Sequence, residues 1–150
     1  MRSGAFVLLC LWCLAVGLAW VLDLQPNLIS LDRILAAPDS RSWLGNDDLG
    51  RDIFARLLSG AEVSFMVAIL VTGITLTIGV TLGLISGFYG GWIDRLLMQI
   101  TDVFLAFPGI LLAIAFAAVL GPGLNNLILA LCLTSWVGYA RLTRAQALSL

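Results

Sequence analysis

The sequence predicts an all-α membrane protein with about four transmembrane helices and one short amphipathic helix at the membrane surface. Composition is the first observation, because 61% of the 150 residues are hydrophobic and only 11% are charged. A soluble domain is about 45–50% apolar and about 25% charged, since its surface needs polar cover. The second observation is that several uncharged runs approach or exceed the length of about 20 residues that a spanning helix needs. Irregular backbone cannot face lipid, so helices are the expected form of these runs.

The first expected transmembrane helix is the uncharged run 5–22, with Arg2 before it and Asp23 after it. The alternative is a secretory signal peptide, for which Arg2 would supply the charged start. The apolar part of a signal peptide is usually about 7–15 residues long, which is shorter than this run. The small residues at 15–19 offer no clean A-x-A cleavage site. We therefore expect a retained helix followed by an extracytoplasmic segment, together covering residues 1–45.

A polar stretch over residues 23–62 holds seven of the nine acidic residues and four of the eight arginines. Apolar residues recur at helical spacing near its end, at Leu49, Ile53, Phe54, Leu57 and Leu58. This spacing predicts the short amphipathic helix, lying at the membrane surface or against neighbouring helices. Asp47 or Asn46 is expected to cap its start, because their side-chain oxygens accept hydrogen bonds from free backbone N–H groups.

The uncharged run 63–89 is long enough to cross the membrane with some tilt. Its glycines Gly79, Gly83 and Gly87 recur at every fourth residue, so they line one side of a helix. Small residues at this spacing let the backbone of another helix approach closely. We expect a helix-packing face here, and a face that lines a substrate pathway is the alternative.

A second uncharged run covers residues 103–140 and is too long for one crossing. The turn signal Gly121-Pro122-Gly123 divides it into two expected helices, 103–120 and 124–140. Pro108 falls near the start of the first of these helices, where proline costs least.

Charged residues at the membrane lip flank these helices. The connection that follows Gly87 contains Asp94 and leads to Asp102, and Arg141 marks the exit of the last helix into water. Asp102 is expected to serve the N-terminus of the helix that follows it, where the helix dipole favours negative charge.

The distribution of arginines predicts the orientation. An even number of crossings puts both termini on one side of the membrane, and each side then holds four arginines. Arg2, Arg141 and Arg144 flank helices closely and have no acidic neighbours in the sequence. By the positive-inside rule, both termini are therefore expected in the cytoplasm.

The sequence offers little chemistry. It has no His and no Lys, and it lacks the phosphate-loop pattern G-x-x-x-x-G-K-[ST]. We therefore expect no catalytic residue, no cofactor and no metal site, so the chain is not expected to be an enzyme. The spacing of Asp47, Asp48 and Asp52 does not match a calcium loop. Cys10 and Cys13 lie in an apolar run, where cysteine behaves as a small hydrophobic residue.

Two stretches resemble a known family. Residues 43–57, WLGNDDLGRDIFARL, resemble the W-L-G-T-D-x-L-G-R-D-x-F-S-R-L signature of the dipeptide, oligopeptide and nickel ABC importer permeases, in particular their second permease subunit. Residues 87–108, GFYGGWIDRLLMQITDVFLAFP, resemble the family's G-x-x-G-G-x-x-D-x-x-x-M-R-x-x-D-x-x-x-x-F-P pattern. The segments 120–126 and 136–141 match as well. The signature residues considered as site residues are Gly45, Asp47, Leu49, Gly50, Arg51, Asp52 and Arg56. Asn46 departs from the pattern, which has Thr at that position.

The resemblance implies a partial ABC importer permease (MetI-like) fold. Residues 46–150 would form the N-terminal part of the permease transmembrane domain. In that family, a cytoplasmic coupling loop with a Glu-Ala-Ala motif and two more helices follow at this point. We therefore expect the chain to be truncated before that loop.

The function that the resemblance implies is import of peptides, nickel or similar small solutes by alternating access. The implied partners are a second permease subunit, two ATPase subunits that bind ATP, an extracytoplasmic substrate-binding protein and the lipid bilayer of the bacterial inner membrane. No basic patch indicates a nucleic-acid partner. Two alternatives stay open, which are a non-ABC channel or carrier and a non-transporting membrane fragment that only packs with partner helices.

Overall fold

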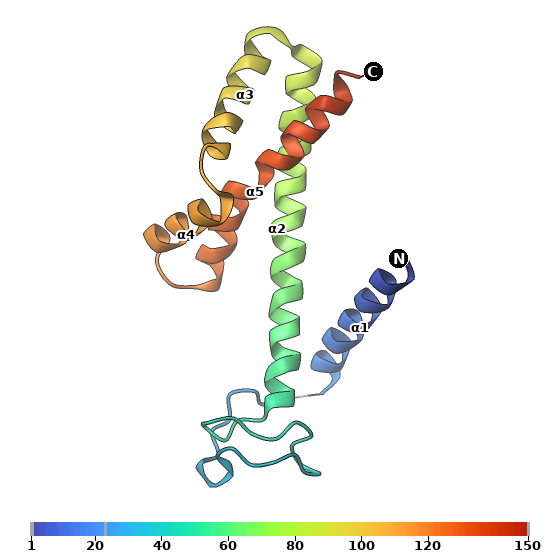
Figure 1. Ribbon diagram of the computed structural model, residues 1–150, viewed down its shortest axis with the longest axis vertical. Coiled ribbons are helices and arrows are strands. Elements are labelled where there is room, and N and C mark those ends of the chain that lie inside the picture. Colours follow the sequence, from blue (N-terminus) through green and yellow to red (C-terminus); the bar gives the residue numbers. More distant parts are fainter. Residues whose placement is uncertain (1, 23, 150) are drawn as a thin grey trace. The chain divides into compact units, whose positions relative to one another are not determined.

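Figure 1 shows the computed structural model, which describes residues 2–22 and 24–149. Their regular elements are all helical: α1 (Arg2–Val21), the short 3₁₀ helix η1 (Leu31–Arg33), α2 (Ile53–Tyr89), α3 (Gly91–Leu105), α4 (Gly109–Leu120) and α5 (Leu124–Ala147). An isolated antiparallel bridge joins Asn46 and Asp52. This architecture confirms the predicted all-α class. Asp23, where the polar stretch is predicted to begin, lies outside the described residues.

The chain divides into two compact units, Met1–Met66 and Val67–Leu150. In the first unit, α1 packs against the beginning of α2. The ring of Trp12 meets the ring of Phe65 edge to face, with 5.7 Å between the centroids. The Trp12 indole N–H donates to the carbonyl oxygen of Ala61 at 3.4 Å. In the second unit, α5 is the central element, because α3 and α4 both pack on it.

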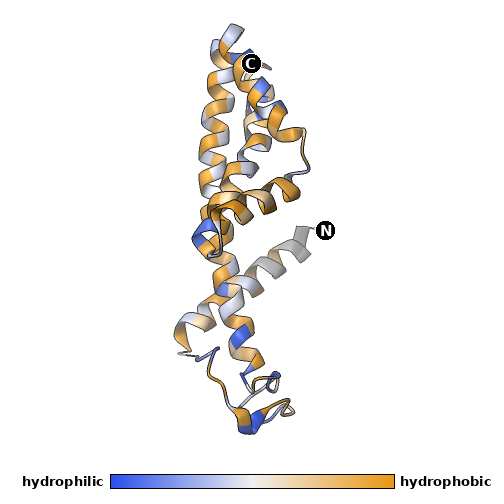
Figure 2. Ribbon diagram, turned by 90° about the vertical axis from the view of Figure 1, so that its left-hand side faces the viewer, coloured by the Kyte–Doolittle hydropathy of each residue, from blue (hydrophilic) through white to orange (hydrophobic). Residues whose placement is uncertain are grey.

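The candidate membrane spans are fewer than predicted. Among the described residues, α2 is the one helix that is long and apolar enough to cross a membrane by itself. Helix α1 has 20 residues and carries no charge after Arg2. Figure 2 shows hydrophobic residues along α2, α4 and α5, and Phe88 and Val119 are 82% and 85% exposed. Surfaces of this kind need lipid or another protein to cover them.

Helix α2 begins earlier than the predicted span, and this corrects the prediction of a separate amphipathic helix. Residues 53–58 are the first turns of α2, which continues without a break to Tyr89. Gly60 costs about 1 kcal/mol relative to alanine in a helix, but no proline interrupts the chain here, so the helix propagates through this position. With 37 residues α2 is about 55 Å long, whereas the hydrocarbon core of a bilayer is about 30 Å thick. Helix α2 is therefore longer than the lipid core is thick.

The predicted single helix over 103–120 is wrong. Helix α3 ends at Leu105 and α4 starts at Gly109, and the two helices are bent by 85° at the break, as a broken span or a re-entrant loop would be. The cause is Pro108, which has no N–H to donate and disfavours helical geometry at Phe107. The expected connection that follows Gly87 is also mostly helical, because residues 91–102 of it lie in α3.

Helices α4 and α5 are joined by a short turn and pack on each other. The turn at residues 121–123 confirms the predicted division of the long apolar run. The Asn126 amide closes this turn by donating to the carbonyl oxygens of Leu120 at 2.8 Å and Gly121 at 3.2 Å. Helix α5 is longer than predicted, so Arg141 and Arg144 lie inside it rather than beyond its end. The core of this unit is small and includes Val137 and Ala140 on α5.

Candidate functional site

The signature segment, residues 43–57, is organised around the carboxylate of Asp47. One oxygen of this carboxylate accepts hydrogen bonds from the backbone N–H groups of Leu49 and Arg51, both at 2.9 Å. The other oxygen accepts from Arg51 Nε at 2.8 Å and from the guanidinium of Arg56. Asp47 is therefore the hub that joins the turn before α2 to the first turn of that helix.

These partners keep Asp47 ionised. Burial of the side chain raises the pKa of the carboxyl group, because it disfavours the charged form. The backbone N–H groups of Arg51 and Leu49 and the Arg51 guanidinium outweigh burial, and they lower the pKa from 3.8 to about 2. The charge of Asp47 therefore persists throughout the physiological pH range.

The signature segment folds back on residues 30–36. Leu35 N–H donates to the Asp47 carbonyl oxygen and Asn46 N–H donates to the Ala36 carbonyl oxygen, both at 3.0 Å. Gly50 has φ +74°, and a Cβ at this residue would collide with the carbonyl group of Ser30. Glycine is required here because it tolerates a positive φ and leaves room for the neighbouring chain.

The cap of α2 is Asp52, and the expectation of Asp47 or Asn46 as the cap is wrong. The Asp52 carboxylate accepts from the N–H groups of Phe54 at 2.8 Å and Ala55 at 3.3 Å. Asn46 is buried in the bridge that precedes the helix, where its amide N–H donates to the Gly50 carbonyl oxygen at 2.8 Å. The cap lies later than expected because residues 46–52 form a tight turn.

In the second unit, α5 lies against the glycine face of α2. A Cβ at Gly79 would be 2.5 Å from Tyr139 Cβ, and a Cβ at Gly83 would be 2.5 Å from the Ala140 carbonyl oxygen. A Cβ at Gly87 would be 2.6 Å from Ala147 Cβ. The structure thus brings all three glycines together with one partner helix, so that the two backbones approach closely.

Two ion pairs connect α3 with α5. Asp102 lies in the last part of α3, and Arg141 Nη1 donates to its carboxylate at 3.2 Å. The expectation that Asp102 serves the N-terminus of a following helix is therefore wrong, because Asp102 lies inside α3 and the next helix begins only at Gly109. Asp94, near the start of α3, forms a two-bond contact with Arg144, in which Nη2 and Oδ2 are 2.6 Å apart.

Sequence reasoning missed Ser86 and did not pair Arg144 with Asp94. Ser86 is fully buried, and its hydroxyl donates to the same carboxylate oxygen of Asp94 that accepts from Arg144 Nε. The signal available in the sequence was an aspartate and an arginine near the ends of two apolar runs. Their separation of 50 positions hides the pairing until the helices are placed.

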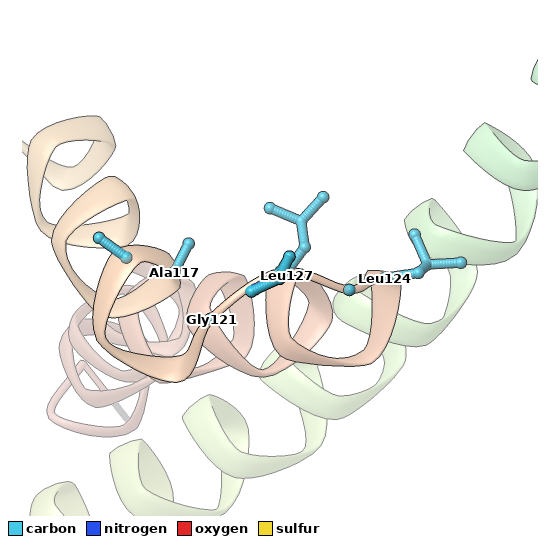
Figure 3. A pocket seen from close by; sticks show the side chains of 7 residues that line it. Ala117, Gly121, Leu124 and Leu127 are labelled. Atoms are coloured by element: carbon cyan, nitrogen blue, oxygen red, sulfur yellow. The ribbon is translucent and has the colours of Figure 1, made fainter.

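An open apolar cavity of about 620 Å³ lies beside the turn between α4 and α5 (Figure 3). The labelled lining residues are Ala117, Gly121, Leu124 and Leu127. The remaining ones are Ala118, Pro122 and Gly123. This lining suits an apolar occupant and offers no polar side chain to orient a reacting group. Within residues 2–22 and 24–149, no group of three or more Cys, Asp or Glu residues is placed to hold a metal ion.

Comparison with known proteins gives a consistent picture. Residues 79–150 match the family model described as "Binding-protein-dependent transport system inner membrane component". The chain is 44% identical over 152 aligned positions to the glutathione transport system permease protein GsiD of Pectobacterium atrosepticum, covering 99% of this chain and 49% of that protein. It is 37% identical to the nickel transport system permease protein NikC of Escherichia coli, covering 99% of this chain and 54% of that protein.

A third relative is the dipeptide transport system permease protein DppC of Alkalihalophilus pseudofirmus, which is 47% identical over 116 residues, or 77% of this chain and 38% of that protein. The chain thus spans about half the length of the curated relatives it matches, or less. These relatives are transport permeases, which are not enzymes. Residues 79–150 therefore carry the domain of inner membrane components of binding-protein-dependent transport systems, and the chain is similar over most of its length to glutathione, dipeptide and nickel permeases.

Proposed function

We propose that this chain forms part of the translocation pathway of an ATP-binding cassette importer, as a permease subunit that works by alternating access. The observation that carries the proposal is that 99% of the chain aligns with permeases whose names specify glutathione and nickel transport. Peptides, nickel and similar small solutes are the proposed substrates, because the relatives cover this range of solutes. The exposed apolar helices supply surfaces that can face lipid and partner helices.

The proposed partners follow from what the chain has and lacks. The family description names a binding protein, which supports an extracytoplasmic substrate-binding partner. The sequence has no phosphate loop, so ATP binding and hydrolysis are assigned to two separate ATPase subunits. A second permease subunit completes the pathway. ATP can drive the change of access only if the two conformations bind it with different affinities.

We assign the protein to the bacterial inner membrane as a multi-pass subunit with a cytoplasmic N-terminus. In this arrangement residues 1–45 form the first transmembrane helix and an extracytoplasmic segment, and residues 46–150 belong to the permease domain. The hub at Asp47 would then hold a rigid extracytoplasmic surface for the binding protein. The glycine face of α2 would hold α5 in place beside the pathway.

The test is purification of the protein after co-expression with ATPase, permease and binding-protein subunits of the same importer class from the same organism. The ATPase subunits are expected to co-purify, and proteoliposomes holding ATP are expected to take up glutathione, dialanine or Ni²⁺ when the binding protein is added. Uptake that needs neither ATP nor the ATPase subunits would contradict the proposal and favour a carrier. Absence of any ATPase subunit from the purified complex would contradict it as well.

A further inference from the structure

Ser86, Asp94 and Arg144 form a three-helix cluster, in which each residue comes from a different helix. Ser86 lies near the end of α2, Asp94 near the start of α3 and Arg144 near the end of α5. Arg144 meets both carboxylate oxygens of Asp94, and the Ser86 hydroxyl donates to one of them. Three donors from two other helices thus converge on a single carboxylate.

The cluster differs from the second ion pair between the same helices. The Asp94 and Arg144 side chains are only 20% and 30% exposed, whereas those of Asp102 and Arg141 are 63% and 49% exposed. An exposed pair with one hydrogen bond contributes little to stability. Breaking a partly buried, two-bond pair leaves an uncompensated charge and is far more costly. The inner pair is therefore the one that fixes the two helices to each other.

The backbone positions of the cluster are fixed as well. A Cβ at Gly83 would be 3.1 Å from the Arg144 backbone nitrogen, and one at Gly87 would be 3.4 Å from the Arg144 carbonyl oxygen. The Arg144 backbone is thus pressed against α2 while its side chain reaches α3. At the other end of α3, the Phe104 ring packs edge to face on Trp136 of α5, with 5.7 Å between centroids. Helix α3 therefore lies antiparallel to α5 and is held at both ends.

The charges of this unit gather at the end where the cluster lies. All three arginines of residues 67–150 are at this end, at Arg95, Arg141 and Arg144, and the turn between α4 and α5 carries no charge. The positive-inside rule makes the arginine-rich end cytoplasmic. ATP is a cytoplasmic molecule, so any ATPase subunit must act from this side.

We propose that the Ser86–Asp94–Arg144 cluster is a clamp that makes the ends of α2, α3 and α5 move as one body when ATP drives the transport cycle. This inference rests on the proposed function, because the driving force is assigned to the ATPase subunits. When the end of α5 is displaced, the contacts of Arg144 displace α3 and α2 with it, so the three helix ends do not slide relative to one another. Asp94 and Arg144 are positioning residues in this scheme, since neither needs to contact the solute.

The test places spin labels on α3 and α5 of the full-length permease in its complex with the ATPase subunits. Trp92 and Leu142 are suitable label sites because they are 73% and 61% exposed. The native cysteines are first replaced by alanine, and the distance between labels is measured by pulsed electron paramagnetic resonance without nucleotide and after trapping with ATP and vanadate. The expected result is one narrow distance distribution that is the same in both states. A distance that changes with nucleotide in the otherwise native protein would overturn the clamp.

Variants separate the clamp from a general loss of structure. Asp94→Asn and Arg144→Gln are each expected to broaden the distribution and to lower solute uptake per ATP hydrolysed about tenfold. The double variant is expected to be no worse than either single variant, because the residues act as a pair. The matched control, Asp102→Asn, is expected to change neither quantity. Equal effects of the control and clamp variants, or additive effects in the double variant, would overturn the proposal.

Two measurements keep the result interpretable. If Asp94→Asn fails to assemble, Ser86→Ala replaces it, and a distribution as narrow as that of the native protein would then count against the clamp. The distances are also measured in the permease without ATPase subunits, where Asp94→Asn is still expected to broaden them. If the native permease binds no ATPase subunit but Asp94→Asn still broadens the distances, the proposed function is contradicted while the clamp is supported.

Discussion

Gly83 of α2 lies directly against the carbonyl oxygen of Ala140 on α5, because a Cβ at Gly83 would be 2.5 Å from that oxygen. A backbone oxygen in a helix cannot move aside as the end of a flexible side chain can. Any side chain at residue 83 must therefore push the two helices apart. Close approach of backbones is what small residues at a four-residue spacing provide within membranes.

Gly83→Ala is expected to destabilise the packing of α5 on α2 by about 1–3 kcal/mol, as overpacking of a filled contact does. The measurement is the free energy of unfolding in mixed detergent micelles. Gly73→Ala is the matched control, because Gly73 lies on the same helix with nothing within 4 Å of its position for a Cβ. Equal stability of the two variants would contradict the packing described for Gly83.

Gly50→Ala is expected to disrupt the signature segment. The substituted residue would have φ +74° and would also meet the Ser30 carbonyl group. The left-handed conformation alone costs about 1–2 kcal/mol in an L-residue, and the collision adds to this cost. Gly60→Ala is the control, since nothing lies within 4 Å of a Cβ built at Gly60. The expected result is faster proteolysis within residues 24–52 for Gly50→Ala only, and equal rates in both variants would contradict it.

The Asp47 hub is expected to make the signature segment sensitive to acid. The pKa of Asp47 is about 2 in the folded protein against an ordinary value of 3.8. A lowered pKa means that the ionised carboxylate stabilises the fold above pH 3.8 and that this contribution is lost as the pH falls through about 2. Proteolysis within residues 24–52 by an acid-stable protease is expected to rise across this window.

Asp47→Asn is expected to raise proteolysis already at pH 7 and to flatten its dependence on pH, because the titrating group is gone. Asp48→Asn serves as the control, since the Asp48 side chain is 80% exposed and meets Arg51 only at 3.8 Å. The hub would be refuted by an Asp47→Asn profile that follows that of the native protein.

Asp52→Ala is expected to loosen the first turn of α2. Loss of an N-cap acceptor costs about 0.5–2 kcal/mol, because backbone N–H groups are left without partners. The measurement is hydrogen exchange at the Phe54 and Ala55 amides, which donate to the Asp52 carboxylate. Exchange is expected to accelerate in Asp52→Ala and to stay near the native rate in Asp52→Asn, which keeps an acceptor. Unchanged exchange in the alanine variant would rule out the cap.

Local patterns in the sequence predict part of this fold. The absence of charge after Val63 predicts a long apolar helix, and Gly121-Pro122-Gly123 predicts the turn between α4 and α5. These features depend on a few neighbouring residues, so a single sequence is enough to find them. The glycine spacing predicts a packing face in the same way, but it does not identify the helix that fills the face.

Features that depend on distant contacts or on competition between local signals could not be predicted. The sequence predicts Pro108 near the start of a helix, but the residues before it form a helix of their own, so the chain bends there by 85°. The neighbouring residues alone suggest that Asp102 serves a helix N-terminus, whereas its actual partner, Arg141, is 39 positions away in the sequence. The same distance problem hides the pairing of Asp94 with Arg144.

In the proposed topology, α2 crosses the inner membrane, with the signature segment outside and the turn between α2 and α3 in the cytoplasm. Labelling of single cysteines with a membrane-impermeant maleimide tests it most directly, in full-length protein whose native cysteines are replaced by alanine. In cells whose outer membrane has been permeabilised, Leu44→Cys is expected to react, Ile74→Cys to stay unlabelled and Trp92→Cys to react only after the inner membrane is opened. Labelling of residues 44 and 92 from the same side, or of residue 74 from the water phase, would contradict the claim.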